Sequence, residues 1–435
     1  MRHLYRALLA MILVGGSAAA WTLPDVFPDE PPESPAPDPR LVRRQAIAFH
    51  EKRLVEDPHS ALDMAGLAAV LMEEGRAMAD DRAFTRAESL SRRSLAERTR
   101  KNGRSMALLV NALLAQHRFG EAAATAKQLV VREPDEPAYR ALLAETLMEV
   151  GDYEAAIRQL GPIARHRADP GIAPRFARWA ELTGQVGEAR RILRAAQQEA
   201  SRRVDLTADQ RTWFALRLAD LELRHGNLRA AGKAIDAGLQ LSPRDWRLNS
   251  AQARLEAANG SWRAASRYAD EVTAEVPSPE AFALAALAKR ALGLTDDAEA
   301  LEAALEGLLG QAGALHRGWA FTLLDRGRSV DPIVAAVAAD SLVRQDVHTL
   351  DLLAWALHRA GRSAEALPLV RRAMRTGIVE PSLRYHAGII EMAVGDLHAA
   401  REHLKVAAAR ERALTRAQRA EIRRLVSAHT PARRN

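Results

Sequence analysis

Apolar residues recur along this chain at the spacing of an α-helix rather than of a β-strand. Between residues 138 and 163, for example, the large apolar positions are Leu142, Leu143, Leu147, Val150, Ile157 and Leu160. Side chains at such intervals lie on one face of a helix. No period-two run of β-branched residues occurs anywhere in the 435 residues. The pattern therefore predicts an all-α protein.

A small residue recurs at one phase of a repeat along almost the whole chain. These marker positions are Ala68, Val110, Ala144, Ala177, Ala219, Ala253, Ala286, Ala320, Ala354 and Gly388. Seven residues after each marker stands a turn residue: Gly75, His117, Gly151, Gly184, Gly226, Gly260, Gly293, Gly327, Gly361 and Gly395. Because helices approach closely only where side chains are small, each unit is predicted to be a helical hairpin. A period of about 34 residues indicates a stacked solenoid of about ten hairpins.

Two of the turns carry a family resemblance. Gly151–Ala156 and Gly226–Ala231 resemble the inter-helix turn of the tetratricopeptide repeat family, and the similarity covers residues 59–413. Prolines fall where repeats of that family end, at Pro134, Pro243 and Pro277. The resemblance implies a right-handed α-solenoid in which the first helix of each hairpin lines a concave groove.

Several positions depart from the family pattern. Pro332 replaces the second-helix alanine, which predicts an irregular turn after Gly327. About eight extra residues near Ala77–Phe84 and near Gln197–Asp209 are expected to lengthen loops or helices. The carboxylate clamp of chaperone-binding members is not matched either. Capture of a free C-terminal peptide is therefore not expected.

The N-terminus has the features of an export signal. Arg2 and Arg6 precede a short apolar run, and Ala18 and Ala20 form a small-x-small cleavage pattern. Residues 1–20 are predicted to be a signal peptide cleaved after Ala20, or a retained inner-membrane anchor. The protein is accordingly expected in the periplasm, in the second case with inner-membrane association. Residues 21–39 are predicted to be an acidic, proline-rich linker.

Both ends of the repeat array, residues 59–413, carry features of capping helices. Asp38 and Pro39 supply an N-cap and a proline at the first helical position, which predicts an N-terminal capping helix over residues 40–58. Thr415 and Gln418 are spaced as a capping box. Residues 414–435 are therefore predicted to be a C-terminal capping helix followed by a basic tail.

The net charge of +7 comes from the C-terminus. Residues 401–435 contain ten basic and three acidic residues, and the chain upstream contains 52 of each. A solvated capping helix and tail explain this excess, and contact with anionic lipid is the alternative. Aromatic side chains interleaved with basic ones, which single-strand binders use, are missing, so no nucleic-acid partner is expected.

Catalytic and metal-binding motifs are absent from the sequence. The chain has no cysteine, no His-Glu-x-x-His helix, no Gly-x-Ser-x-Gly elbow and no phosphate-binding glycine loop. His398 and His403 are five residues apart and so lie on different helix faces. We therefore expect no enzyme activity, no cofactor and no metal site.

One face of the last two repeats is rich in aromatic, histidine and arginine side chains, which are typical of recognition surfaces. The candidate residues are His348, Asp351, Trp355, His358, Arg359, Tyr385, His386, Ile389 and Met392. Two interpretations remain open. Either this face is a partner groove, or Trp355 packs between helices and the histidines bond to local carbonyl groups.

Two function classes follow from these features. The first is a non-catalytic exported scaffold that binds a protein or peptide partner in the concave groove, within a cell-envelope assembly. The alternative is a small-ligand or metal-binding accessory protein that uses the last two repeats. Co-purification with a protein partner would favour the scaffold. Thermal stabilisation by a metal or small molecule would favour the alternative.

Overall fold

The structure is a computed structural model that describes residues 38–203, 206–312 and 316–428. The signal segment, the linker up to residue 37 and the tail from residue 429 lie outside these ranges. The chain divides into two units, residues 1–42 and 43–435, and the first contributes only the start of α1. Within the described ranges every regular element is helical, as predicted.

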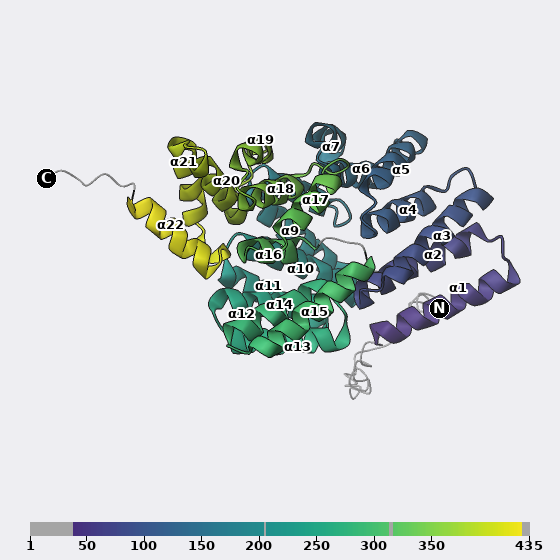
Figure 1. The fold of residues 1–435 in the computed structure, drawn as a ribbon. Coiled ribbons are helices and arrows are strands. Elements are labelled where there is room, and N and C mark those ends of the chain that lie inside the picture. The colour runs from purple at the N-terminus through teal and green to yellow at the C-terminus, as the bar shows by residue number, and fades with distance from the viewer. Residues whose placement is uncertain (1–37, 204–205, 313–315, 429–435) are drawn as a thin grey trace, which may run out of the picture. The chain divides into compact units, whose positions relative to one another are not determined.

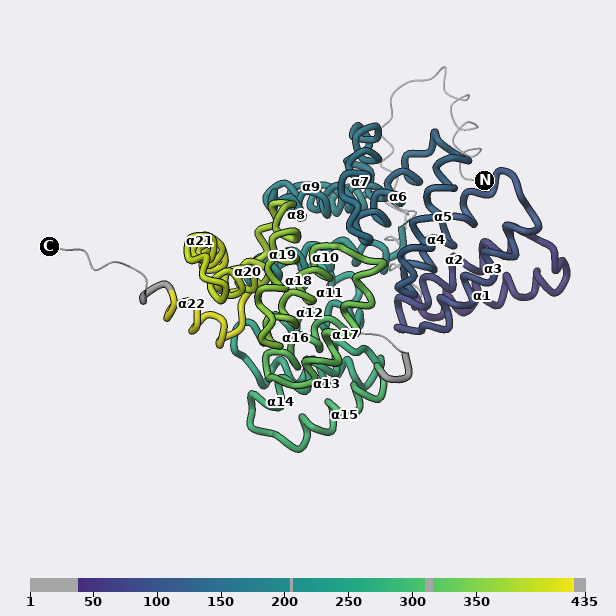
Figure 2. Tube along the Cα trace, turned by 45° about the horizontal axis from the view of Figure 1, so that its top comes forward, coloured from purple at the N-terminus to yellow at the C-terminus, as the bar shows by residue number. Residues whose placement is uncertain are grey.

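Twenty of the helices form ten hairpins, numbered one to ten along the chain. They pair α2 (Ala61–Met78) with α3 (Asp81–Glu97), α4 (Gly103–Ala115) with α5 (Phe119–Arg132), α6 (Pro137–Val150) with α7 (Tyr153–Leu160), α8 (Ala173–Leu182) with α9 (Val186–Arg202), α10 (Ala208–Arg224) with α11 (Leu228–Leu241), α12 (Trp246–Asn259) with α13 (Trp262–Glu275), α14 (Pro279–Ala291) with α15 (Thr295–Ala312), α16 (Arg317–Asp325) with α17 (Val330–Asp340), α18 (Val347–Arg359) with α19 (Ser363–Met374), and α20 (Pro381–Ala393) with α21 (Leu397–Ala408). The flanking helices are α1 (Pro39–Glu56) and α22 (Arg416–Ala428), and two 3-10 turns are η1 (Gly161–His166) and η2 (Glu411–Ala413). Figures 1 and 2 follow the hairpins from purple to yellow along the chain.

The marker residues lie at the contact between the two helices of each hairpin. All nine that have a side chain are at most 3% exposed. Gly388 shows why the position must be small, because an added Cβ there would lie 2.6 Å from Cγ of Leu404. Eight of the ten predicted turns have glycine in the left-handed conformation, which glycine adopts without steric cost. The solenoid prediction is therefore confirmed.

The predicted turn at Gly75 is wrong. Gly75 is buried inside α2, which continues to Met78, and Ala79 takes the left-handed conformation with φ 49°. The extra residues of this repeat thus lengthen the helix before the turn. Gly75 has a packing role instead, since an added Cβ would lie 2.5 Å from the ring of Phe84.

The turn after Gly327 is irregular, as its proline predicts. Gly327 and Ser329 both have positive φ, 69° and 55°. In the second long repeat, near residues 197–209, the extra residues lengthen two helices rather than one, because α9 and α10 each have 17 residues.

At the C-terminal end, Thr415 Oγ1 accepts a hydrogen bond from the Gln418 N–H at 3.2 Å. The Thr415 N–H donates to Gln418 Oε1 at 3.0 Å, which completes the predicted capping box.

The first helices form one continuous side of the array. Those of successive hairpins contact each other from α2 to α8 and from α10 to α20. At the start of α12, Trp246 Nε1 donates to the Ala77 carbonyl of α2 at 3.0 Å. Gln210 of α10 donates to Glu73 of α2 at the same distance. First helices four and five hairpins apart therefore face each other, so we call this side the inner face.

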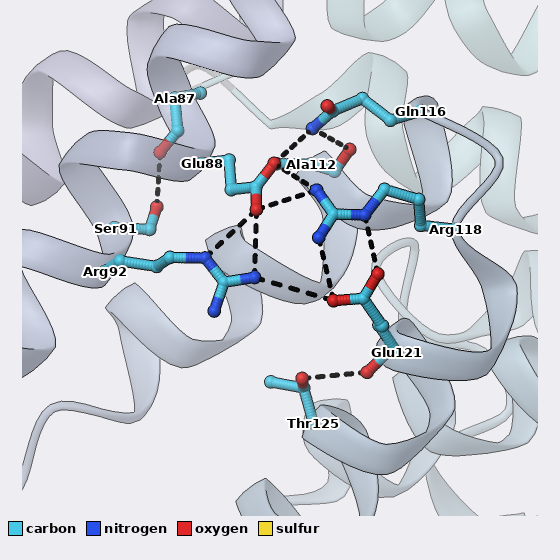
Figure 3. Close-up of polar contacts among 9 residues, drawn as sticks. All are labelled: Ala87, Glu88, Ser91, Arg92, Ala112, Gln116, Arg118, Glu121 and Thr125. Atoms are coloured by element: carbon cyan, nitrogen blue, oxygen red, sulfur yellow. Dashed lines mark hydrogen bonds and ion pairs between the residues drawn. The ribbon is translucent and has the colours of Figure 1, made fainter.

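Buried glutamates join neighbouring hairpins through arginine. Glu88 of α3 is 8% exposed and accepts two hydrogen bonds from Arg118 Nη1, at 2.8 and 2.7 Å (Figure 3). Arg92 and Gln116 donate to the same carboxylate, and Arg118 also pairs with Glu121. Comparable arginine pairs hold Glu181, Glu222, Glu302 and Glu391. A planar guanidinium can give such a carboxylate two parallel hydrogen bonds, which a lysine ammonium cannot.

No helix in the described ranges is both long and apolar enough to cross a lipid bilayer.

Enlarging a marker residue should destabilise the array. Ala253 is fully buried between helices, so Ala253→Leu should lower the free energy of unfolding by about 1–3 kcal/mol through overpacking. The control is Ser261→Ala in the same hairpin, because Ser261 is exposed and its side chain caps nothing. Denaturant titration followed by circular dichroism measures both changes. Equal stability of the two variants would contradict this packing.

Candidate functional site

The nine residues predicted to form a recognition surface lie on α18 and α20, two adjacent first helices. Four of them are buried: Asp351 at 1%, Trp355 at 3%, Tyr385 at 4% and His386 at 3% exposure. His348, His358, Ile389 and Met392 are half-buried, and Arg359 is exposed. The structure thus brings the set together, but with the largest side chains turned into the packing between hairpins.

Four rings form a column through hairpins eight to ten. Phe321 stacks on His386 at 5.1 Å between centroids, and His386 stacks on Trp355 at 4.3 Å. Trp355 in turn stacks on His358 at 5.1 Å. The rings come from α16, α20 and α18, so the column ties three first helices together. Sequence reasoning singled out three of these rings and missed Phe321.

The polar atoms of this column have partners within the chain. Trp355 Nε1 donates to Asp325 Oδ1 at 3.1 Å, and His386 Nδ1 lies 2.9 Å from Asp351 Oδ2. Tyr385 donates its hydroxyl to Glu421 of α22 at 2.5 Å. Burial and the charge of Glu421 raise the pKa of Tyr385 far above its usual range, so the phenol stays protonated. The buried part of the predicted surface therefore stabilises the fold, and partner binding by the accessible part stays a prediction.

In hairpins four and five the inner face carries arginine side chains around a small pocket. A pocket between α8, α9 and α10 has an apolar floor that includes Leu193 and Leu221, and Arg178, Arg217 and Arg224 lie around it. These guanidinium groups face a single carboxylate in the pocket wall, that of Glu181. The pocket therefore carries a local excess of positive charge.

The carboxylate of Glu181 is fully engaged. Arg224 donates to its two oxygens at 2.9 and 3.1 Å, and His225 Nε2 lies 3.3 Å from Oε1. Burial acts to raise the pKa of Glu181, but Arg224 and His225 outweigh burial and hold that pKa well below its usual range. Arg178 reaches the same carboxylate only at 3.5 Å. Glu181 is therefore a structural ion-pair centre.

Arg217 is left without a carboxylate partner. Among the described residues it makes no hydrogen bond and no ion pair, and its one close contact is with the Trp213 ring, at 5.8 Å from the centroid. The nearby Asp220 is hydrogen-bonded to Arg254 at 2.6 Å. Burial lowers the pKa of Arg217, which is the expected effect on a cation whose charge is poorly compensated. Arg217 lines the pocket.

Sequence reasoning missed this charged region, although a signal exists. The residue directly after each marker is polar or charged in hairpins two to six: Asn111, Glu145, Arg178, Asp220 and Arg254. In hairpins seven to ten the same position is apolar: Leu287, Phe321, Trp355 and Ile389. At this position the first helices therefore divide into a charged and an apolar group. The nine candidate residues came only from helices of the second group.

No group of three or more histidine, cysteine, aspartate or glutamate side chains is placed to hold a metal ion in the described ranges.

Comparison with known proteins finds a family match in part of the array. A model of the family described as tetratricopeptide repeat matches residues 78–146 and 113–176. No curated protein matches the chain.

Solved structures with similar folds are distant in sequence. The Cut9–Hcn1 hetero-tetramer of APC/C is similar with 11% identity over 90% of this chain and 88% of that chain, at a TM-score of 0.43. A human IFIT1 dimer with PPP-AAAA is similar with 15% identity over 84% of this chain and 86% of that chain, at a TM-score of 0.44. Naa15/Naa10 bound to HypK-THB is similar with 15% identity over 90% of this chain and 66% of that chain, at a TM-score of 0.28. At these scores the three structures carry no argument about function.

Truncating Trp355 should destabilise the fold. Because the ring is buried and stacked on two histidines, Trp355→Ala should cost about 3–5 kcal/mol of unfolding free energy. The control is Arg359→Ala on the same helix, which removes an exposed side chain and should change stability by about 0.5 kcal/mol or less. Thermal unfolding of both variants measures the difference. A melting temperature for Trp355→Ala equal to that of the wild type would show that the ring is not core.

Proposed function

Because this chain is a tetratricopeptide-repeat protein, we propose that it is a non-catalytic scaffold whose inner face binds a protein or peptide partner. The observation that carries the proposal is Arg217, whose guanidinium group on the inner face has no hydrogen bond or ion pair to any described residue. A half-buried cation of this kind gains most from an anionic group supplied by a partner. The partner segment is therefore expected to present carboxylates.

The surroundings of Arg217 combine apolar and cationic side chains. Leu193 and Leu221 form an apolar floor, and Arg178 offers a second cation. Arginine is enriched among interface residues that dominate binding energy, since its planar donors bind carboxylates in a fixed geometry. In the last two hairpins, His348, His358, Arg359, Ile389 and Met392 remain accessible and form the proposed second contact region.

We also propose that the protein is exported and acts within a cell-envelope assembly. The support is the N-terminal pattern of Arg2, Arg6 and the apolar run, with Ala18 and Ala20 before the linker. The absence of cysteine means that a periplasmic form needs no disulfide for folding.

The partner proposal is tested by affinity capture from envelope extract, followed by titration with the purified partner. Wild-type protein should capture the partner, and Arg217→Gln should bind it at least about tenfold more weakly, which corresponds to 1.4 kcal/mol. The matched control is Arg229→Gln, because Arg229 is exposed on α11, the second helix of the same hairpin. Equal loss in both variants would indicate general charge attraction. Equal binding by Arg217→Gln and wild type would refute the inner-face assignment.

The location proposal is tested with a reporter joined to residues 1–40 and with mass spectrometry of the native N-terminus. Export should give periplasmic reporter activity and a mature chain that begins at Trp21. A membrane-bound chain that retains Met1 would assign the anchored form. Soluble cytosolic protein that retains Met1 would refute export.

A further inference from the structure

Three hairpin turns in the first half of the array touch loops in the second half. The turns belong to hairpins three, four and five and contain Gly151, Gly184 and Gly226. They meet residues 344–347, 377–379 and 410–413, which lie close to 190 residues further along the chain. We call these three contacts the seam. The first of them joins the turn between α6 and α7 to the segment between α17 and α18.

The first contact of the seam is strongly polar. The Gln345 N–H donates to the Val150 carbonyl at 3.0 Å, and the Val347 N–H donates to the Tyr153 hydroxyl at 2.8 Å. Arg344 donates to Glu149 Oε2 at 2.8 Å, and its guanidinium lies 4.1 Å from the centroid of the Phe119 ring. Backbone, ion pair and ring therefore join α5, α6 and α7 to the start of α18 and the residues just before it.

Glycine allows the two backbones to approach at each contact. An added Cβ at Gly151 would lie 2.4 Å from the backbone of Gln345, and one at Gly184 would lie 2.5 Å from the Gly377 carbonyl. At Gly226 the distance to the Ala413 nitrogen would be 2.8 Å. Backbone atoms cannot rotate away as a side chain can, so any larger residue must push the seam apart.

The later turns contain the same residue without this constraint. An added Cβ at Gly260, Gly293, Gly327, Gly361 or Gly395 would meet no atom within 4 Å. In these five turns glycine serves only the left-handed backbone conformation. Three equivalent contacts in consecutive hairpins, and none in the five that follow, show that the seam is a specific feature of hairpins three to five.

The seam is apolar behind its backbone contacts. Leu182, Val347, Leu350 and Ile378 are buried in one cluster that draws on both sides. No helix of hairpins three to five packs along its length against a helix of hairpins eight to ten within the described ranges. The hairpins themselves are held by full helix packing between neighbours. Opening the seam would therefore leave every hairpin intact.

The seam reaches the apolar core beside the inner face. Val379, in the second contact of the seam, packs against the buried cluster that contains Leu193 and Leu221. Burial lowers the pKa of His348 on α18, and Arg178 of α8 is among the charges that act on it. The pocket with Arg217 thus lies on the inner face directly behind the hairpins that the seam holds in place.

We propose that the seam is a latch: docking of hairpins eight to ten onto the turns of hairpins three to five holds the array closed and limits access to the inner face. A partner that binds this face competes with the latch and shifts the array toward an open form. The effect on partner binding rests on the proposed scaffold function, whereas the latch itself does not.

Distance measurement between two spin labels tests the latch. The chain has no cysteine, so Glu154→Cys on α7 and Val343→Cys before α18 place one label on each side of the first contact, at exposed positions. The wild-type background should give one short, narrow distance distribution. Gly151→Ala should give a longer and broader one, because the added Cβ cannot coexist with the Gln345 backbone.

The matched control is Gly260→Ala. Gly151 and Gly260 have nearly the same φ, 85° and 81°, so both alanines are equally strained, but only the first meets another backbone. The control should keep the wild-type distance. Gly184→Ala and Gly361→Ala form a second pair, with identical φ of 77°. Glu149→Gln removes the ion-pair partner of Arg344 without changing the backbone. It replaces Gly151→Ala as the test variant if Gly151→Ala does not fold.

The outcomes separate the latch from the scaffold proposal. Unchanged distances in Gly151→Ala and Glu149→Gln, or equal changes in Gly260→Ala, would overturn the latch. If the seam variants open, their affinity for the captured partner should rise roughly threefold or more, since less of the binding energy is used to open the array. Opening without any gain in affinity would keep the latch and refute binding on the inner face.

Discussion

Close approach of two helices at a small residue is the contact on which each hairpin depends. Ala253 and Ala354 are fully buried at this contact, and Gly388 touches Leu404 so closely that no side chain fits. A hairpin built in this way still leaves one apolar side uncovered, and the next hairpin covers it. The array is therefore stable only as a stack, and every larger feature of the molecule is placed by the sequence of hairpins.

Arginine has two roles on this scaffold. Between hairpins it engages buried glutamates, as Arg118 does at Glu88 and Arg326 at Glu302. A planar guanidinium can give a carboxylate two parallel hydrogen bonds, which an ammonium group cannot match. On the inner face Arg217 has the same chemistry but no carboxylate to bind. The proposed binding arginine thus differs from the structural ones in that no described residue supplies it with an acid.

The seam changes what kind of solenoid this is. An array with contacts only between neighbours bends freely, and each hairpin adds to its stability independently. Contacts such as that of Arg344 with Glu149 join residues 195 positions apart, so hairpins three to five and eight to ten share part of their stability. In the proposed latch, access to the inner face depends on this distant contact.

Local pattern was enough to predict the helical period, the ten hairpins, their turns and the capping box at Thr415, because each of these depends on residues a few positions apart. Even there, Gly75 was assigned to a turn when α2 in fact runs on to Met78, since an insertion can be absorbed by a helix as easily as by a loop. For the candidate site, spacing showed that Trp355 and Tyr385 lie on first helices. It could not show that Phe321 and His386 cover the Trp355 ring.

Tertiary structure alone decided which glycines lie in the seam. Gly184 and Gly361 occupy the same place in the repeat and have the same φ, yet only Gly184 meets another backbone. The partners of Gly184 lie nearly 200 residues away, and their position follows from the accumulated rotation of many hairpins. That rotation is the sum of small packing differences, which no short stretch of sequence contains.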